Sequence, residues 1–202
     1  MDVKLAAVIV HDIKNALGVL EGELEGMTVN PTPEQAVVAH GTCAALREKL
    51  IAFLTLYKAS TQGLNAQVET VNPEDFLNSL LRTRINARPE LRFTIRAQDM
   101  PVLGFFDENL VGLALEAALQ NATRFARTTV EIGCINDDDG YLCFLIRDDG
   151  EGLGAKEAKP STGLGMELCQ AIAQAHHKGG KTGSVSLDDH PEGGALFRMR
   201  LP

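Results

Sequence analysis

Apolar residues recur at steps of three and four along the first part of the chain, the spacing of one face of an α-helix. One stripe contains Leu5, Ile9, Ile13, Leu17, Leu20, Leu24 and Met27, and a second contains Ala36, Ala39, Cys43, Leu46, Leu50, Phe53 and Tyr57. Between them, the stretch from Met27 to Gln35 carries Pro31 and Pro33, which favour a turn. The pattern therefore predicts two long helices in an antiparallel hairpin.

A hairpin of this length cannot bury both apolar stripes within one chain. Two copies packed as a four-helix bundle would cover them, so we expect a homodimer. The polar stretch from Ser60 to Gln67, which includes Gly63, is typical of a linker. We therefore predict a dimerisation domain at residues 1–62, a linker at 63–67 and a second domain at 68–202.

Patterns typical of helices and strands alternate through the second domain. Helices are predicted at 71–86, where Asn72 is a favourable N-cap before Pro73, at 107–126 and at 163–177. His176 and His177 would close the last helix, where a charged imidazolium suits the helix dipole. Strands are predicted at 91–97, 129–135, 141–148, 183–187 and 195–202. Segregated helices with a mixed sheet indicate a two-layer α/β sandwich, and the whole chain is predicted to be α+β.

Composition and charge exclude several classes of function. The 202 residues are 45% hydrophobic and 23% charged, as in ordinary soluble proteins, and the net charge of −8 argues against nucleic acid as a partner. No run approaches the roughly 20 apolar residues of a membrane span, and no signal peptide pattern is visible. We therefore expect a cytoplasmic protein that does not enter a membrane. The four cysteines lack metal-ligand spacing, which predicts reduced, buried thiols rather than a zinc site.

The first chemical motif is His11, which is followed by Asp12 and, one helical turn later, by Asn15. His11 points about 180° away from the apolar stripe, and Asn15, Gly18 and Gly22 continue its face. An imidazole nitrogen can attack a phosphoryl group, and an adjacent carboxylate can orient the ring and take up its proton. The alternative is a solvated polar face. Two mid-helix glycines, each costing about 1 kcal/mol relative to alanine, count against that alternative.

Two glycine-rich segments lie on either side of residues 155–162. They are RDDGEGLG, with Gly150, Gly152 and Gly154, and STGLGMELCQ, with Gly163 and Gly165. Asp148 ends the strand before the first segment, and its carboxylate could accept a hydrogen bond from an adenine amino group. The second segment begins a helix, where free N–H groups and the dipole favour phosphate. Either segment alone fits an ordinary turn, but together they indicate a nucleotide site.

A fourth motif lies within the helix predicted at 107–126. Asn121 can offer a carboxamide oxygen to Mg²⁺, and Arg124 lies one turn further on, where it can meet phosphate oxygens. A polar helix face would be the better interpretation if this motif stood alone.

In this order the motifs resemble the catalytic core of a two-component sensor histidine kinase. In that family a dimerising hairpin with an H-box precedes a Bergerat-type ATP-binding domain, and the resemblance covers nearly the whole chain. It implies that His11 is the phosphoacceptor, Asp12 the adjacent acid and Asn15 the H-box amide. It also implies a homodimer, a response regulator receiver domain as partner, and a separate sensor protein as a further candidate partner.

The resemblance further implies that the second domain binds ATP and Mg²⁺. LEAALQNATRF matches the N-box, whose asparagine holds magnesium, DDGEG matches the box whose aspartate reads adenine, and GLGMEL matches the box that holds phosphates. The residues implied at this site are Asn121 (for the metal), Arg124, Asp148, Gly150, Gly152, Gly163, Leu164 and Gly165.

Two departures from the family pattern keep other functions open. Ala117 stands where the kinases commonly have asparagine and the related ATPases a water-activating glutamate, and Glu116 lies about 100° further round the helix. The segment between the glycine boxes is also short. Ala117 weakens an ATPase function by direct water activation. The short segment favours a histidine phosphotransferase with a degenerate ATP domain, whereas Asp148, Asn121 and both glycine pairs favour the kinase. A response-regulator phosphatase or a non-catalytic interaction module is a third alternative.

Overall fold

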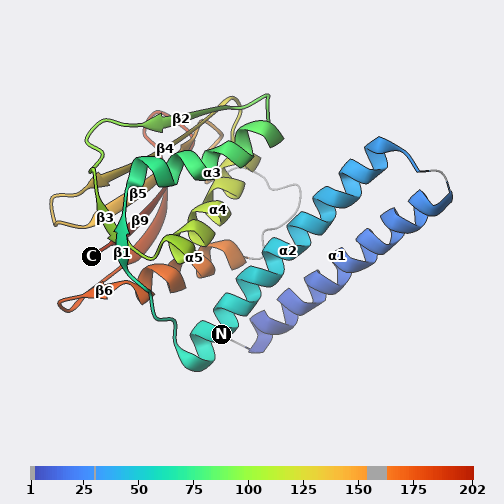
Figure 1. Cartoon of the computed structure of the whole chain (residues 1–202), viewed down its shortest axis with the longest axis horizontal. Coiled ribbons are helices and arrows are strands. Elements are labelled where there is room, and N and C mark those ends of the chain that lie inside the picture. Colours follow the sequence, from blue (N-terminus) through green and yellow to red (C-terminus); the bar gives the residue numbers. More distant parts are fainter. Residues whose placement is uncertain (1–2, 30, 154–162) are drawn as a thin grey trace. The chain divides into compact units, whose positions relative to one another are not determined.

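The computed structural model describes residues 3–29, 31–153 and 163–202, which fall into two compact units. One unit is built on a helical hairpin and the other on the α/β elements that follow it (Figure 1). Each unit is described by itself below.

Helix α1 (Val3–Val29) and helix α2 (Pro33–Gln62) form the hairpin. The side chains of Thr32 and Gln35 each accept the other's backbone N–H, at 3.1 and 3.2 Å, which is a capping box at the start of α2. Pro33 then occupies the first helical position, where its missing N–H costs nothing. Both helices therefore extend into the predicted turn, which is shorter than the sequence pattern indicates.

Only part of each predicted apolar stripe is buried in the hairpin. Buried members are Ile9, Ala39 and Leu46, whereas Leu17, Leu24, Leu50 and Tyr57 are exposed. Ala52 and Leu56 are buried although the predicted stripe omits them.

Cys43 is exposed, so the prediction of buried thiols is wrong at this position, while Cys134, Cys143 and Cys169 are buried.

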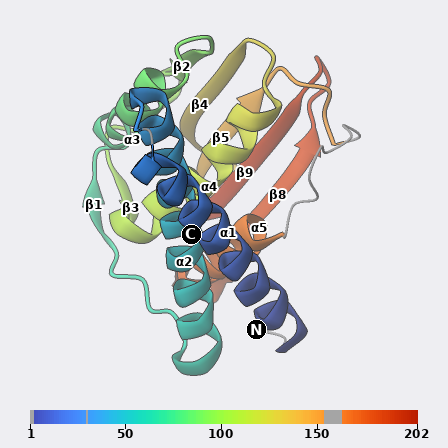
Figure 2. The same cartoon turned by 90° about the vertical axis from the view of Figure 1, so that its right-hand side faces the viewer.

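The second unit is a sandwich of helices on a sheet. Its helices are α3 (Pro73–Ala87), α4 (Glu108–Phe125) and α5 (Leu164–Ala175). Its five-stranded sheet has the order β2 (Arg92–Arg96), β4 (Thr129–Asn136), β5 (Leu142–Asp148), β9 (Ala195–Leu201) and β8 (Ser184–Asp189). The pair β2–β4 is parallel and the other pairs are antiparallel. Figure 2 shows α4 and α5 against one face of this sheet.

Two short ribbons complete the unit. They pair β1 (Glu69–Val71) with β3 (Gly104–Phe106) and β6 (His177–Lys178) with β7 (Lys181–Thr182). Three rings from α3, β3 and β5 form the centre of the core. They are Phe76, Phe106 and Phe144, with ring centroids 5.1–5.9 Å apart and tilted or edge-on contacts.

The predicted fold class is confirmed: a helical hairpin precedes a mixed α/β sandwich. The local start of α3 follows the sequence as well, because the Asn72 side chain accepts the Asp75 N–H at 3.1 Å. Among the described residues, no helix combines the length and apolarity needed to cross a membrane. The dimeric four-helix bundle stays a prediction.

Candidate functional site

His11 lies on α1 with 70% of its side chain exposed. Its Nδ1 is 3.2 Å from the side-chain amide nitrogen of Asn15 and 3.7 Å from Oδ1 of Asp12. The amide nitrogen donates, so this contact places a lone pair on Nδ1; in the other tautomer the Nδ1 proton faces Asp12 and the lone pair is on Nε2. The exposed ring therefore offers a nucleophilic nitrogen to solvent, with a carboxylate beside it.

Helix α4 brings the N-box and both glycine segments together. A Cβ built on Gly165, in the first turn of α5, would lie 3.7 Å from the Cβ of Ala117. A Cβ built on Gly150 would overlap the carbonyl oxygen of Phe125, at the end of α4. Asn121 lies one helical turn from each of these two contacts. Motifs that are far apart in sequence are thus gathered along one helix.

Asp148 ends β5 and is 4% exposed. Its Oδ1 accepts the Gly150 N–H at 2.9 Å and the Ala195 N–H at 3.3 Å. Both N–H groups donate to Oδ1, which holds the carboxylate in one orientation. Neither of these two hydrogen bonds involves Oδ2. This is the arrangement that a fixed acceptor for an adenine amino group requires.

Asp149, the second acid of the motif, has a structural role. Its carboxylate accepts the N–H groups of Arg127 at 2.8 Å and Thr128 at 3.0 Å, which joins the end of β5 to the segment between α4 and β4. Burial raises the pKa of Asp149, but hydrogen bonds from the Thr128 side chain and these backbone groups outweigh it and hold the pKa below its ordinary value. Of the two adjacent acids, Asp149 is thus tied to the segment after α4, whereas Asp148 is held by the glycine box and the start of β9.

Gly152 and Gly163 adopt positive φ angles of 83° and 71°, a conformation that L side chains rarely adopt. Gly163 directly precedes α5, and a Cβ there would meet nothing within 4 Å, so the glycine serves the backbone turn rather than packing. Leu164, the first residue of α5, is buried. Gly154 lies outside the described residues.

Asn121 is half-buried and Arg124 is exposed, both in the last turns of α4. The Arg124 guanidinium lies 5.2 Å from the centroid of the Phe125 ring. A carboxamide oxygen suits Mg²⁺, and Gly165 lies beside Ala117, one turn before Asn121, so these residues fit Mg-ATP. The binding of each group by these particular residues stays a prediction.

Glu116 is occupied elsewhere. Its carboxylate pairs with Arg84 of α3, whose Nε lies 3.1 Å from Oε2. Ala117, one turn before Asn121 on the same face of α4, has no polar side chain. Neither Ala117 nor Glu116 therefore offers a free carboxylate beside Asn121. Water activation by Glu116 is therefore not supported by its position.

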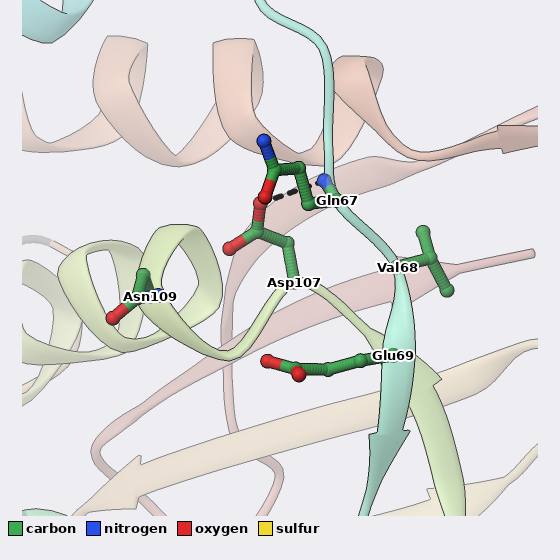
Figure 3. A pocket seen from close by; sticks show the side chains of 5 residues that line it. All are labelled: Gln67, Val68, Glu69, Asp107 and Asn109. Carbon is green, nitrogen blue, oxygen red and sulfur yellow. Dashed lines mark hydrogen bonds between the residues drawn. The ribbon is translucent and has the colours of Figure 1, made fainter.

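A pocket of about 290 Å³ lies at the other end of α4, lined by Gln67, Val68, Glu69, Asp107 and Asn109 (Figure 3). Asp107 caps the helix: Oδ1 accepts the Leu110 N–H at 2.9 Å and Oδ2 accepts the Gln67 N–H at 2.8 Å. At about 1.5 Å per residue, α4 is about 27 Å long, so this pocket is remote from Gly150. It is separate from the candidate nucleotide site.

His176 corrects one sequence-based expectation. Helix α5 ends at Ala175, and the His176 ring is buried, with Nε2 accepting the Asp107 N–H at 3.0 Å and Nδ1 donating to the Ile172 carbonyl at 2.8 Å. Because Nε2 accepts an N–H, it carries no proton and the ring is neutral, linking α5 to the start of α4. Burial also lowers the pKa of His176. The prediction of an imidazolium here is wrong, and the sequence carries no signal for this partnership across 69 residues.

Several known proteins are similar to this chain in sequence. Residues 106–202 match the family model described as "Histidine kinase-, DNA gyrase B-, and HSP90-like ATPase". The sensor protein KdpD of Escherichia coli is 28% identical over 98% of the chain, which spans 24% of KdpD. The adaptive-response sensory kinase SasA of Trichormus variabilis is 26% identical over 98% of the chain, which spans 57% of SasA. The chain therefore corresponds to only part of these relatives.

Solved structures show the same fold. The Acinetobacter baumannii histidine kinase AdeS superposes with a TM-score of 0.74 at 17% identity, covering 95% of this chain and 96% of AdeS. Full-length ShkA in complex with AMPPNP superposes with a TM-score of 0.63 at 19% identity, covering 98% of this chain and 45% of ShkA. The cytoplasmic segment of QseC superposes with a TM-score of 0.57 at 19% identity, covering 77% of this chain and 94% of that segment.

Proposed function

Because the chain has the catalytic core of a sensor histidine kinase, an ATPase domain preceded by a helical hairpin, we propose that it phosphorylates His11 from Mg-ATP. We further propose that the phosphoryl group passes to an aspartate of a response regulator, and that the protein acts in the cytoplasm as a homodimer. The observation that carries the proposal is the convergence on α4: Gly165 packs beside Ala117, and Gly150 packs against Phe125.

The α/β unit would hold ATP as the phosphoryl donor. Asp148 would accept a hydrogen bond from the adenine amino group, and the backbone at Gly163, Leu164 and Gly165 would meet the phosphates. The carboxamide oxygen of Asn121 would hold Mg²⁺, which neutralises charge on the phosphates, and Arg124 would pair with a phosphate oxygen. Phosphoryl transfer depends mainly on positioning and charge neutralisation, so Ala117 in place of a base does not prevent it.

The hairpin would supply the nucleophile. Nε2 of His11 forms a bond to the γ-phosphorus as the bond from that phosphorus to the ADP oxygen breaks. In the tautomer protonated on Nδ1, the positive charge that develops on the imidazole is relieved when the Nδ1 proton passes to Asp12. Transfer to a receiver aspartate reverses these proton movements.

Nucleotide binding is tested by thermal unfolding with and without Mg-ATP. A ligand at 100 times its Kd stabilises the native state by about 2.7 kcal/mol, so we expect a clear rise in Tm. Asp148→Ala should remove most of this rise. Asp138→Ala, at an exposed position in the β4–β5 turn, is the matched control and should retain it.

The second candidate is a histidine phosphotransferase, which Ala117 and the pairing of Glu116 with Arg84 favour. It predicts no Tm change at millimolar Mg-ATP but transfer of phosphate from a phosphorylated receiver domain to His11. A Tm rise together with label transfer from ATP would exclude it.

The domain boundaries at 62 and 68 stay predictions, supported by the end of α2 at Gln62 and the start of β1 at Glu69.

A further inference from the structure

The turn between β8 and β9 packs against the first glycine box. Gly194 in this turn has φ +82°, and a Cβ there would overlap the backbone carbonyl of Asp148. The next residue, Ala195, donates its N–H to Oδ1 of Asp148 at 3.3 Å. The start of β9 therefore fixes both the backbone and the carboxylate of Asp148.

Asp189, the last residue of β8, makes the second attachment. Its Oδ1 accepts the Leu153 N–H at 2.7 Å. The same oxygen occupies the space that a side chain on Gly152 would need, and Gly152 has φ +83°. The glycine is thus required both by its backbone conformation and by the approach of this carboxylate.

The Leu153 N–H is part of a segment outside the ladders of the sheet. Among the described residues, Gly150 to Leu153 make no backbone–backbone hydrogen bond of the turn or loop type. The backbone N–H groups of Gly150 and Leu153 are instead attached to the carboxylates of Asp148 and Asp189. The Glu151 side chain pairs with Arg127 at 3.4 Å. Removing the Asp189 carboxylate would release one of the two backbone attachments.

We propose that Asp189 is a positioning residue for the nucleotide site. By accepting the Leu153 N–H, it fixes the turn that follows Asp148 and so sets the affinity of the site for nucleotide. This inference rests on the proposed binding of ATP by the α/β unit. Asp189 itself acts on the glycine box and takes no part in the chemical step.

Two substitutions separate hydrogen bonding from charge. Asp189→Asn keeps a side-chain oxygen that can accept the Leu153 N–H, whereas Asp189→Ala removes it. The neighbouring Asp188 is the matched control, because its carboxylate pairs with Arg198 and Ser186 on the surface. Each variant of the full chain is compared with the original for ADP and ATP binding by calorimetry, and for amide hydrogen exchange at Leu153 without nucleotide.

We expect Asp189→Ala to raise the nucleotide Kd roughly tenfold and to speed exchange at Leu153, as the loss of a charge-assisted hydrogen bond would. Asp189→Asn should stay within about threefold of the original Kd, and Asp188→Ala should be unchanged. Unaltered Kd in Asp189→Ala, or equal weakening in Asp189→Ala and Asp189→Asn, would overturn the inference. If the original chain binds no nucleotide, the proposed function fails. Exchange at Leu153 still decides whether Asp189 holds the turn.

Discussion

The α/β unit buries the large apolar side chains of α4, β5 and β9, whereas α1 and α2 expose many of theirs. Leu115 and Leu119 of α4 and Phe144 of β5 are 0% exposed. The exposed large apolar residues of the hairpin are Val8, Val10, Leu17, Val19, Leu24, Val37, Val38, Leu50, Ile51, Leu54 and Tyr57. Such a surface is typical of a protein–protein interface. The contrast supports the proposed homodimer, in which the hairpin would gain part of its core from a second chain.

The contrast extends to the candidate chemistry. In the α/β unit, Asp148 is buried and its orientation is fixed by two backbone donors. In the hairpin, the His11 side chain is 70% exposed and has polar contacts with Asp12 and Asn15 of its own helix. A nucleotide site needs preorganised groups, whereas a phosphoacceptor must be reached by other proteins. The fixed carboxylate of Asp148 and the exposed ring of His11 therefore fit the roles proposed for the two units.

Core truncation should separate the two units most strongly. Leu115→Ala should lower the free energy of unfolding of the α/β unit by about 2–5 kcal/mol, because it opens a cavity at a fully buried site. Leu54→Ala, at a side chain that is 60% exposed in the hairpin, should change the free energy of unfolding of the hairpin by less than about 0.5 kcal/mol in dilute monomeric protein. Urea titrations followed by amide NMR signals of each unit measure both. Equal costs at the two positions would break the comparison.

A charge on the exposed face of α2 should affect association rather than folding. We expect Leu54→Glu to raise the dimer Kd by at least about 100-fold, since burying an unpaired carboxylate is unfavourable. Val102→Glu is the control, because Val102 is 77% exposed on the α/β unit. Sedimentation over a range of protein concentrations gives both constants. Unchanged association in Leu54→Glu would remove this face of α2 from the proposed bundle.

The buried ring of His176 should make the stability of the α/β unit depend on pH. Burial lowers its folded-state pKa below the unfolded value of about 6.5, so its stabilising contribution is full above that pH and is lost as the pH falls below it. The free energy of unfolding should therefore rise with pH below about 6.5, by at most about 1.4 kcal/mol per pH unit from this group. His176→Gln should remove that part of the slope. An identical slope in the variant would show that the ring titrates normally.

The smallest effect is expected on the glycine face of α1. A Cβ on Gly22 would meet nothing within 4 Å, so Gly22→Ala should stabilise the hairpin by up to about 1 kcal/mol. If this face receives a receiver domain, the same change should slow phosphotransfer from His11. Thermal unfolding and the rate of transfer to a receiver measure the two effects. Faster or unchanged transfer would show that the glycines leave no docking face.

Features set by neighbouring residues could be predicted from the sequence. The N-cap of α3, the hairpin between β4 and β5, and the exposure of His11 all follow from local spacing and turn chemistry. The fold class could be predicted for the same reason, because long amphipathic helices and alternating strands carry their own signals.

Features set by distant partners could not be predicted. The three-residue strands β1 and β3 pair across the whole of α3, and too few residues are involved to give a periodic pattern. The Thr32–Gln35 capping box, which shortens the predicted turn, is by contrast a local signal that could have been predicted from the sequence. Asp149 and Asp189 look like any surface acid in the sequence, and only the folded chain brings them to Thr128 and Leu153. The roles assigned to Asn121, Arg124 and Asp148 remain predictions about ligands.

The central claim is that the α/β unit supplies a phosphoryl group to a histidine on the hairpin. The most direct measurement is incubation of the full chain with Mg-ATP labelled at the γ-phosphate. His11→Gln is compared with His40→Gln, an exposed histidine on α2. We predict an acid-labile, alkali-stable phosphoprotein in the original chain and in His40→Gln, and none in His11→Gln. Label that persists in His11→Gln, or no label in a chain that binds ATP, would contradict the account.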